Sequence, residues 1–261
     1  MLTRSGERPD NLRIVSHPMS GTDALFERYY YAKPAFLNGT AEFHNMIAGV
    51  ARPNARILEI GAGPSNKTSR FLASLGALTG VDVSDEVLAN DALARARVST
   101  GSKLPFSDET FDVCVSNFVL EHVEDPQTHF REVARVLAPG GVYCFRTPNL
   151  WHYVAFISRV LPHNFHLKYA NRLRNREAGA HDPYPTFYRS NTRRRAAVLS
   201  KDAGLEIVEL RMVEKEPSYA KSSRLLFWPL LGYERMVNAH RVFEGVRANI
   251  FGVVSKNSSG R

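Results

Sequence analysis

Short apolar runs alternate along residues 56–149 with segments in which apolar side chains recur every three or four residues. The runs have the composition of parallel strands buried on both faces, and the recurring pattern is typical of amphipathic helices. The predicted strands cover residues 56–63, 77–84, 96–100, 111–120 and 142–149. The predicted helices between them cover residues 66–76, 84–96 and 124–141. This alternation predicts an α/β fold with a doubly wound, mostly parallel sheet.

The regular alternation stops after Asn149. Residues 150–190 are aromatic, basic and dotted with proline, which predicts a segment inserted after the fifth strand, with the role of a substrate cap. Two more strands complete a seven-stranded sheet, and the elements of this part are predicted over residues 191–204 (helix), 205–214 (strand), 233–248 (helix) and 249–256 (strand). Residues 23–51 predict one or two helices. We expect a flexible tail over residues 1–21 and a single domain over residues 22–261.

The composition is that of a globular protein without membrane spans. Apolar residues make up 44% and charged residues 23% of the chain. The apolar run "LLFWPLLGY" from Leu225 is far shorter than the ~18 residues of a membrane helix, and residues 1–16 lack the apolar segment of a secretory signal. Cys114 and Cys144 lie inside apolar strands, which predicts buried thiols in a reducing compartment. These features predict a cytoplasmic protein.

The positive charge is concentrated in one part of the chain. Residues 159–195 hold nine Lys or Arg against two Asp or Glu, and so carry most of the net charge of +8. Such a segment suits an anionic substrate, an anionic membrane surface or RNA. A solvated basic face without a partner explains the same composition, and the sequence leaves both interpretations open.

A glycine-rich turn follows the first predicted strand. Gly61 and Gly63 lack Cβ and permit a tight turn that a ligand approaches closely. Asp82 ends the second strand, 21 residues after Gly61. In doubly wound sheets, ligands bind at the carboxyl ends of the strands, and an acid at this position accepts hydrogen bonds from ribose hydroxyls. As an alternative, Asp82 only stabilises the start of the next helix.

The turn departs from the dinucleotide fingerprint G-x-G-x-x-G. The third glycine is replaced by Asn66, and Pro64 and Ser65 crowd the approach of a pyrophosphate. Glu59 places a carboxylate before the turn, which repels a pyrophosphate and suits a cationic ligand. The turn therefore favours an adenosyl ligand with an ammonium or sulfonium group over a nicotinamide cofactor, although Glu59 also suits a purely structural role at the turn.

Four stretches in order resemble a known family: "ILEIGAGPS", "GVDVS", "LPFSDETFDVCVSNFVLEHVEDP" and "REVARVLAPGG". They are similar to successive motifs of the class I S-adenosylmethionine-dependent methyltransferases, of the small-molecule type often called type 11. The resemblance implies a Rossmann-like methyltransferase fold, with residues 203–210 and 249–256 as its sixth strand and antiparallel seventh strand. It implies S-adenosyl-L-methionine as cofactor.

The resemblance also implies a set of cofactor-binding residues. Glu59, Gly61 and Gly63 would hold the methionine end and Asp82 the ribose, while the stretch "NFVLEHV" would line the site beside the sulfonium. The whole implied set is Glu59, Gly61, Ala62, Gly63, Asp82, Val83, Ser102, Lys103, Asn117 and Phe118. The chain departs from the family pattern at Ser65, where a third glycine is common, and at Ser102, where an adenine-binding aspartate is usual.

His122 is the candidate general base. It follows the fourth strand at the edge where the cofactor is expected, and the pKa of a free imidazole suits proton removal from an alcohol or phenol. Packing of the loop is the alternative role. Asn117 is placed to position ligand atoms but cannot act as a base.

The inserted segment supplies candidate substrate contacts. Aromatic side chains at Tyr184, Phe187 and Tyr188, with Arg189, are expected to roof the site, where Arg189 would bind an anionic group; an aromatic mini-core under a surface loop is the alternative. Asn149, Tyr188 and Arg189 form the predicted substrate set. Without paired cysteines or an H-E-x-x-H motif, the histidines of this segment predict no metal site.

The acceptor is predicted only by class. The stretch "SNFV" lacks the Asn/Asp-Pro-Pro-Tyr motif of many base methyltransferases, so nucleic acid is not favoured. We expect methylation of a small-molecule, lipid-linked or sugar-linked acceptor, on oxygen. The stretch "RLLFWPLLGY" is expected to pack on the sheet, with peripheral membrane contact as the alternative. A non-catalytic binding module and a nicotinamide-dependent oxidoreductase are the competing functions.

Overall fold

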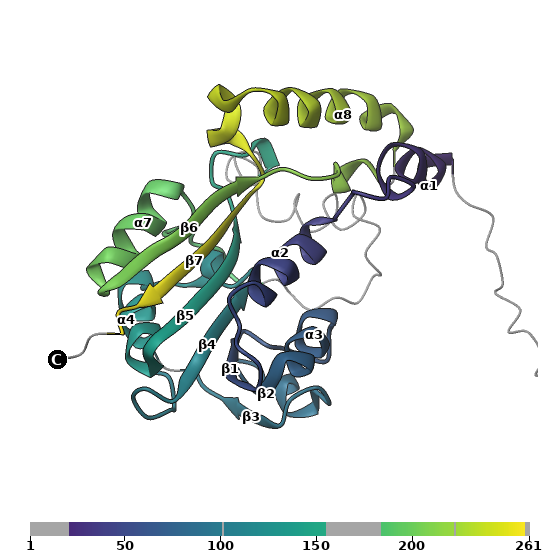
Figure 1. The fold of residues 1–261 in the computed structure, drawn as a ribbon. Helices are drawn as coiled ribbons and strands as arrows, with labels where there is room; N and C mark the ends of the chain where they lie inside the picture. The colour runs from purple at the N-terminus through teal and green to yellow at the C-terminus, as the bar shows by residue number, and fades with distance from the viewer. Residues whose placement is uncertain (1–20, 101, 155–183, 222, 259–261) are drawn as a thin grey trace, which may run out of the picture.

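A seven-stranded sheet forms the centre of the protein in the computed structural model, which describes residues 21–100, 102–154, 184–221 and 223–258 (Figure 1). The strand order is β3-β2-β1-β4-β5-β7-β6. The strands are β1 (Ala55–Ile60), β2 (Gly76–Asp82), β3 (Arg95–Val98), β4 (Phe111–Asn117), β5 (Leu137–Pro148), β6 (Leu205–Val213) and β7 (Asn249–Lys256). β7 runs antiparallel to both β5 and β6, and the other pairings are parallel. The predicted doubly wound sheet is confirmed.

Helices cover both faces of this sheet. The α-helices are α1 (Gly21–Phe26), α2 (Gly39–Ala48), α3 (Lys67–Leu75), α4 (Pro126–Val136), α7 (Arg193–Asp202) and α8 (Arg224–Ala239). The shorter helical segments are the π-helix η1 (Glu27–Tyr31) and the 3-10 helices η2 (Asp85–Ala89), η3 (Leu120–His122), η4 (Ser218–Ala220) and η5 (Arg241–Val246).

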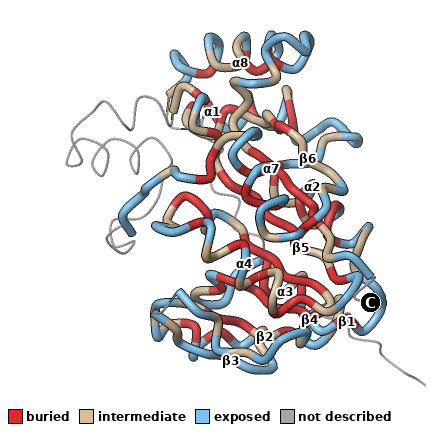
Figure 2. The backbone as a smooth tube through the Cα atoms, turned by 90° about the vertical axis from the view of Figure 1, so that its left-hand side faces the viewer, coloured by how far each residue is buried: buried red, intermediate tan, exposed pale blue. Residues whose placement is uncertain are grey.

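Two apolar layers enclose the sheet. On one face, α4 and α7 bury Phe130, Val133 and Leu199 against side chains such as Leu58. On the other face, α2 and α3 bury residues such as Phe43 and Leu72 against the sheet. Successive side chains of a strand point to opposite faces, so the strands of the parallel part must be apolar throughout. Figure 2 shows this buried backbone through the middle of the molecule.

The predicted helix over residues 84–96 is shorter than expected. Only η2 forms, because Asn90 leaves the helix to bond the glycine turn: its Nδ2 donates to the carbonyl of Gly63 at 3.1 Å and to Ser69 Oγ at 3.2 Å. A side-chain amide that satisfies distant groups in this way competes with continuation of the helix.

The stretch "RLLFWPLLGY" does not pack on the sheet as expected. It begins α8, whose Phe227 and Leu231 form a separate cluster with Phe26 and Tyr30 of the N-terminal helices. The two faces of the sheet are already covered by the other helices, so α8 and α1 form a further layer beyond one edge of the sheet (Figure 1).

Most of the predicted tail and cap lies outside the described residues, namely residues 1–20 and 155–183. Among the residues that the structure describes, no helix is long and apolar enough to cross a membrane. The described side chains also contain no cluster of three or more His, Cys, Asp or Glu suited to a metal ion. His163, His166 and His181 lie outside that part of the chain.

Candidate cofactor and active site

The glycine turn has left-handed backbone at both glycines, with φ of 71° at Gly61 and 52° at Gly63. A Cβ on Gly61 would collide with Val119 Cγ2, so close packing as well as conformation requires glycine there. A Cβ on Gly63 would have only Asp82 Oδ2 near it, at 4.0 Å. The inner side of Gly63 therefore borders open space next to a carboxylate.

Asp82 is held in place at the end of β2 by two backbone N–H groups. Ser84 donates to Oδ1 and Gly63 donates to Oδ2, each at 2.9 Å. A carboxylate oxygen accepts more than one hydrogen bond, so both oxygens retain capacity for ribose hydroxyls. The N–H groups of Gly61 and Ala62 point to the carbonyl of Val81, and Val83 presents an exposed apolar side chain beside the carboxylate.

The N-terminus of α3 is capped by the chain itself. Asn66 Oδ1 accepts from the N–H groups of Thr68 and Ser69 at 2.8 and 3.1 Å. Its Nδ2 donates to the carbonyl of Ala62 at 3.0 Å. A bound pyrophosphate would need these helix N–H groups. This cap gives a physical reason against a dinucleotide, beyond the missing third glycine.

Ser65, the departure from the family pattern in this turn, has a structural role. Its hydroxyl bonds the Asp91 carboxylate and accepts from the Asp91 N–H at 3.1 Å. These hydrogen bonds join the turn to the segment after η2, a connection that a glycine at this position could not make.

Two buried acceptor atoms at this edge have no partner within the described part of the chain. They are Glu59 Oε2 and Asn117 Oδ1. Asn117 donates its Nδ2 to Thr68 Oγ1 at 3.3 Å, so the amide orientation leaves the oxygen unsatisfied. Unsatisfied buried acceptors are rare in proteins and call for an explanation such as a ligand that donates hydrogen bonds.

The pKa of Glu59 is raised to about 7, mainly by burial and also by the nearby charge of Asp82, while a hydrogen bond from Ser69 opposes both effects. The Ser69 hydroxyl already accepts from Asn66 and Asn90, which directs its own proton to Glu59. A cation placed at Oε2 would restore the charged carboxylate. The two acceptors Glu59 Oε2 and Asn117 Oδ1 therefore fit the methionine end of S-adenosylmethionine, whose ammonium group supplies both positive charge and hydrogen-bond donors.

Ser102 and Lys103 lie on the surface after β3. Lys103 borders a surface hollow formed by residues 104–108 and Arg135. The structure shows no contact that joins either residue to Glu59 or Asp82, although Ser99 bonds the carbonyl of Asp82 at 2.8 Å and so anchors the start of their loop. Their role in adenine binding stays a prediction.

Arg135 holds this loop in place and was missed by the sequence interpretation. Its guanidinium donates to the carbonyls of Phe106 at 2.8 Å and Leu104 at 3.0 Å, and Glu132 accepts from the N–H of Leu104 at 2.8 Å. The Glu132–Arg135 pair, in the motif "REVARVL", thus positions the "LPF" motif. The spacing of the two motifs was visible in the sequence, but the contact was not.

Phe118 and Arg146 form a second feature that the sequence interpretation did not connect. Phe118 has a φ of 60° and an exposed ring, and the Arg146 guanidinium carbon lies 4.3 Å from the ring centroid. Arg146 is buried, which lowers its pKa to about 10 against the opposing charges of Glu216, Glu121 and Glu42. Its Nη1 donates to Thr40 Oγ1 at 3.3 Å, which joins α2 to the carboxyl end of β5. The only sequence signal was an arginine within an apolar strand.

His122 lies in η3, directly after β4, and contacts the far end of the cap segment. Its Nδ1 is 3.0 Å from the carbonyl oxygen of Pro185. Because a carbonyl only accepts, Nδ1 carries the proton, and Nε2 of the neutral ring is the nitrogen able to accept one. The Tyr184 ring lies 6.2 Å away.

The residues after this contact continue along the same loop. The N–H groups of Phe187 and Tyr188 donate to the carbonyl of Glu121 at 2.7 and 3.2 Å. Arg189 donates to the carbonyl of Glu124 at 2.6 Å and stacks at 5.3 Å on Phe187. The structure therefore brings Tyr188 and Arg189 to the His122 loop, with the Arg189 guanidinium partly used by protein contacts.

Asn149 is placed differently from the expectation. It is fully buried, and its Nδ2 donates to the carbonyls of Gly245 and Arg247, both at 2.8 Å. Its Oδ1 accepts from the N–H of Trp151 at 3.2 Å. These bonds use the amide to join β5 to the segment before β7, so Asn149 is not brought to the acceptor side of the site.

Glu121 is a buried carboxyl next to His122 that the sequence interpretation did not single out. It accepts from Thr147 Oγ1 at 3.1 Å, and Asn191 donates to the same hydroxyl at 2.6 Å. Burial raises its pKa, while His122 and Arg146 act in the opposite direction. This network connects η3, β5 and the start of α7 beneath the candidate base.

Comparison with known proteins agrees with this architecture. The family model described as a methyltransferase domain matches residues 58–145. An uncharacterized protein of Methanocaldococcus jannaschii is 40% identical over 91 residues, which are 34% of this chain and 42% of that protein. A demethylmenaquinone methyltransferase of Mycolicibacterium paratuberculosis is 34% identical over 119 residues, 42% of this chain and 52% of that protein. The chain spans about half the length of these curated relatives.

A solved structure from Methanosarcina mazei, described as a SAM-dependent methyltransferase, shares the fold with a TM-score of 0.53 and 21% identity, over 82% of this chain and 98% of that one. The sheet order with its single antiparallel strand β7 defines a Rossmann-like methyltransferase fold. Residues 58–145 thus match a methyltransferase-domain model, and the chain as a whole shares the fold of S-adenosylmethionine-dependent methyltransferases.

Proposed function

We propose that the protein transfers a methyl group from S-adenosylmethionine to a small-molecule acceptor. The observation that carries this proposal is the pair of unsatisfied buried acceptors, Glu59 Oε2 and Asn117 Oδ1, at the strand edge that also bears Gly63 and Asp82. When bound, S-adenosylmethionine supplies a methyl group already activated by its sulfonium, so the protein mainly has to position the two reactants.

Different residues of the site bind the ribose, bind the methionine end and accept the proton. Asp82 binds the ribose hydroxyls, Glu59 and Asn117 bind the methionine end, and Phe118 covers the site from the end of β4. His122 Nε2 accepts the proton that an acceptor hydroxyl loses, while the bond from Nδ1 to the carbonyl of Pro185 fixes the ring and its tautomer. The charge that then develops on His122 is stabilised by the nearby Glu121.

We further propose an acceptor with an apolar or aromatic body and an oxygen as the methylated atom. The exposed rings of Phe118, Tyr184 and Phe187 near the His122 loop, together with the name of the demethylmenaquinone methyltransferase relative, support an aromatic acceptor. The oxygen is proposed because His122 is placed to remove a hydroxyl proton. A quinol-type acceptor presents a hydroxyl whose proton a histidine removes. Arg189 is available for an anionic substituent at the exposed side of the loop.

A calorimetric titration tests the cofactor first. We expect S-adenosylhomocysteine to bind in the micromolar range and NADH to show no binding. With labelled S-adenosylmethionine, transfer to phenolic and quinol acceptors then tests the reaction. Binding of NADH alone would revive the oxidoreductase alternative, and binding of neither ligand would support a non-catalytic member of the fold.

A further inference from the structure

α8 carries apolar side chains on its exposed side as well as on its buried side. Phe227, Leu231 and Val237 face inward. Leu225 on the opposite side is 88% exposed and Met236 is 43% exposed. A surface helix of a globular protein normally places polar residues outward, so the apolar residues on the exposed side of α8 need an explanation.

The outward stripe contains no charged residue. At helical spacing it consists of Leu225, Pro229, Gly232 and Met236, and Trp228 borders it with 52% of its surface exposed. η5, which follows α8, also exposes an apolar residue, Val242, at 82%. Exposed apolar patches of this extent are uncommon on monomeric proteins without a partner. We refer to the residues Leu225, Trp228, Pro229, Met236 and Val242 as the α8 stripe.

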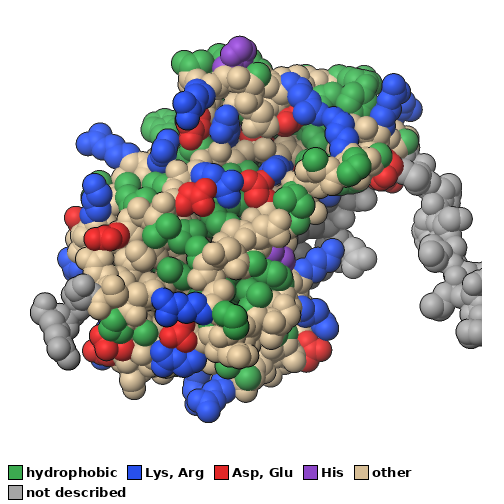
Figure 3. All heavy atoms as spheres, in the orientation of Figure 1, with side chains coloured by type: hydrophobic (Ala, Val, Ile, Leu, Met, Phe, Trp, Pro, Cys, Tyr) green, Lys and Arg blue, Asp and Glu red, His purple; other side chains and the backbone are tan. Residues whose placement is uncertain are grey.

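α8 and the segments next to it also expose basic side chains. The exposed ones on α8 and the adjoining turns are Arg28, Lys221, Arg224, Arg235 and Arg241. The acid of α8 itself, Glu234, is buried beneath the helix, where it accepts from the Tyr30 hydroxyl at 3.2 Å and lies 3.3 Å from Arg235. Asp23 and Glu27 are the exposed acids of the neighbouring α1 and η1. Figure 3 shows hydrophobic and basic side chains together along the rim that α8 forms in Figure 1.

The α8 stripe lies on the acceptor side of the molecule. β6 and β5 both run antiparallel to β7, so β6 ends at the same edge as the parallel strands that carry the glycine turn and His122. α8 follows β6 through η4. A partner that binds the α8 stripe therefore approaches the edge of the sheet at which an acceptor would enter.

We propose that the α8 stripe docks the protein on the surface of an anionic lipid bilayer, with α8 lying in the interface plane. Leu and Trp on one face with flanking Arg and Lys are the features of interfacial helices, and Trp favours the headgroup region. Anionic headgroups complement the exposed cations. A second copy of the chain is a poorer occupant, because a twofold interface would place the same arginines against each other.

Vesicle co-sedimentation tests the proposal with the whole chain. We expect binding to vesicles of phosphatidylcholine with phosphatidylglycerol and much weaker binding to phosphatidylcholine alone. Leu225→Glu with Met236→Glu removes the apolar contact and is expected to weaken binding by roughly tenfold or more. The matched control is Val208→Glu with Val198→Glu, which introduces the same two charges at exposed apolar positions of β6 and α7 and should bind normally.

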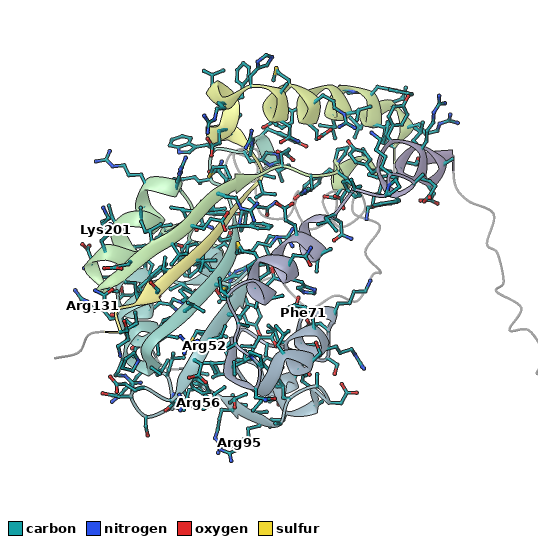
Figure 4. All side chains as sticks on the ribbon, viewed as in Figure 1. Arg52, Arg56, Phe71, Arg95, Arg131 and Lys201 are labelled. Atoms are coloured by element: carbon teal, nitrogen blue, oxygen red, sulfur yellow. The ribbon has the colours of Figure 1, made fainter. Side chains whose placement is uncertain are left out.

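A charge-reversal pair separates the α8 site from the protein's overall charge. Arg224→Glu with Arg235→Glu is expected to weaken binding to anionic vesicles by roughly tenfold or more. Arg52→Glu with Arg95→Glu changes the net charge equally, at the end of the molecule away from α8 (Figure 4), and should retain most of the binding. Equal loss in both pairs would overturn the α8 site in favour of non-specific attraction.

Tryptophan fluorescence gives a readout independent of variants at the stripe. The chain has two tryptophans, so Trp151→Phe leaves Trp228 as the reporter. We expect a blue shift on adding anionic vesicles and quenching by brominated lipid chains. An unchanged spectrum, or a concentration-dependent dimer that Leu225→Glu with Met236→Glu abolishes, would overturn the proposal. Neither assay measures methyl transfer, so the result is independent of the proposed activity.

Discussion

The N–H group of Gly63 donates a 2.9 Å hydrogen bond to Oδ2 of Asp82, which joins the turn after β1 to the end of β2. Gly63 follows β1 and Asp82 ends the neighbouring parallel strand β2, and the bond fixes the carboxylate beside the open side of Gly63. The glycine and the acid therefore form one continuous part of the candidate cofactor site, and the predictions below test its components separately.

Asp82→Ala is expected to weaken binding of S-adenosylhomocysteine by about 1.5–3 kcal/mol, roughly ten- to more than a hundredfold in Kd, because the ribose loses a charged acceptor. Isothermal titration calorimetry measures the change. Asp85→Ala, which removes an exposed acid three residues later, serves as control and should bind normally. Unchanged affinity in Asp82→Ala would place the ribose elsewhere.

Gly63→Val is expected to abolish cofactor binding because the side chain enters the open space beside Asp82. The left-handed backbone alone makes any L-residue there costly, by about 1–2 kcal/mol. Gly204→Val is the matched control, since Gly204 has a φ of 75° with no atom near its Cβ position. Both variants should lose similar thermal stability, while only Gly63→Val loses the ligand. Normal binding by both would mean that the turn is not the site.

The affinity for S-adenosylhomocysteine is expected to rise with pH and to level off above the Glu59 pKa of about 7. The cationic amino group of the ligand binds the carboxylate form, so below this pH binding must release a proton. Titrations in buffers of different ionisation enthalpy count that proton. Glu59→Gln should lower the affinity and remove the pH dependence, and a pH dependence that survives in this variant would assign it to another group.

The raised pKa of Glu59 also makes the stability of the unliganded fold depend on pH, and this stability falls as the pH rises. The folded-state pKa of Glu59 lies above the value of 4.5 for a free carboxyl. The unliganded protein therefore loses stability as the pH rises from about 4.5 through about 7. In this interval the folded protein keeps the buried carboxyl protonated, whereas the unfolded chain lets it ionise. Chemical denaturation of the wild type and of Glu59→Gln across this interval should show the loss only in the wild type.

His122→Ala is expected to lower turnover by roughly 10²–10⁴-fold while the affinity for S-adenosylhomocysteine stays close to wild type, because a general base acts on the acceptor. Single-turnover kinetics with a phenolic acceptor measures the step. The control is His240→Ala at an exposed histidine after α8. Full activity in His122→Ala would leave the residue a packing role in the loop.

Arg135→Met is expected to lower the free energy of unfolding by about 1–3 kcal/mol, because the carbonyls of Leu104 and Phe106 lose a charged donor and Glu132 loses its partner. Arg131→Met, at an exposed position of the same helix (Figure 4), should change stability little. Urea denaturation compares the two, and equal stabilities would show that the loop does not depend on this contact.

The sequence by itself determined the class of fold and predicted the sheet edge at which the candidate cofactor residues lie. Buried parallel strands must be apolar on both faces, so the sheet was legible as a series of short runs separated by helical patterns. Gly61, Gly63 and Asp82 were recognisable because a ligand turn needs residues without Cβ and an acid at a set distance along the chain.

The tertiary structure decided what depends on contacts between distant segments. Asn149 looked like a substrate residue at the end of a strand, but its amide is used by the carbonyls of Gly245 and Arg247. The apolar run at Leu225 looked like core, yet both faces of the sheet were already covered and α8 turned an apolar face outward. A local pattern records which residues are apolar or polar, whereas the partner of each side chain is set by how the whole chain packs.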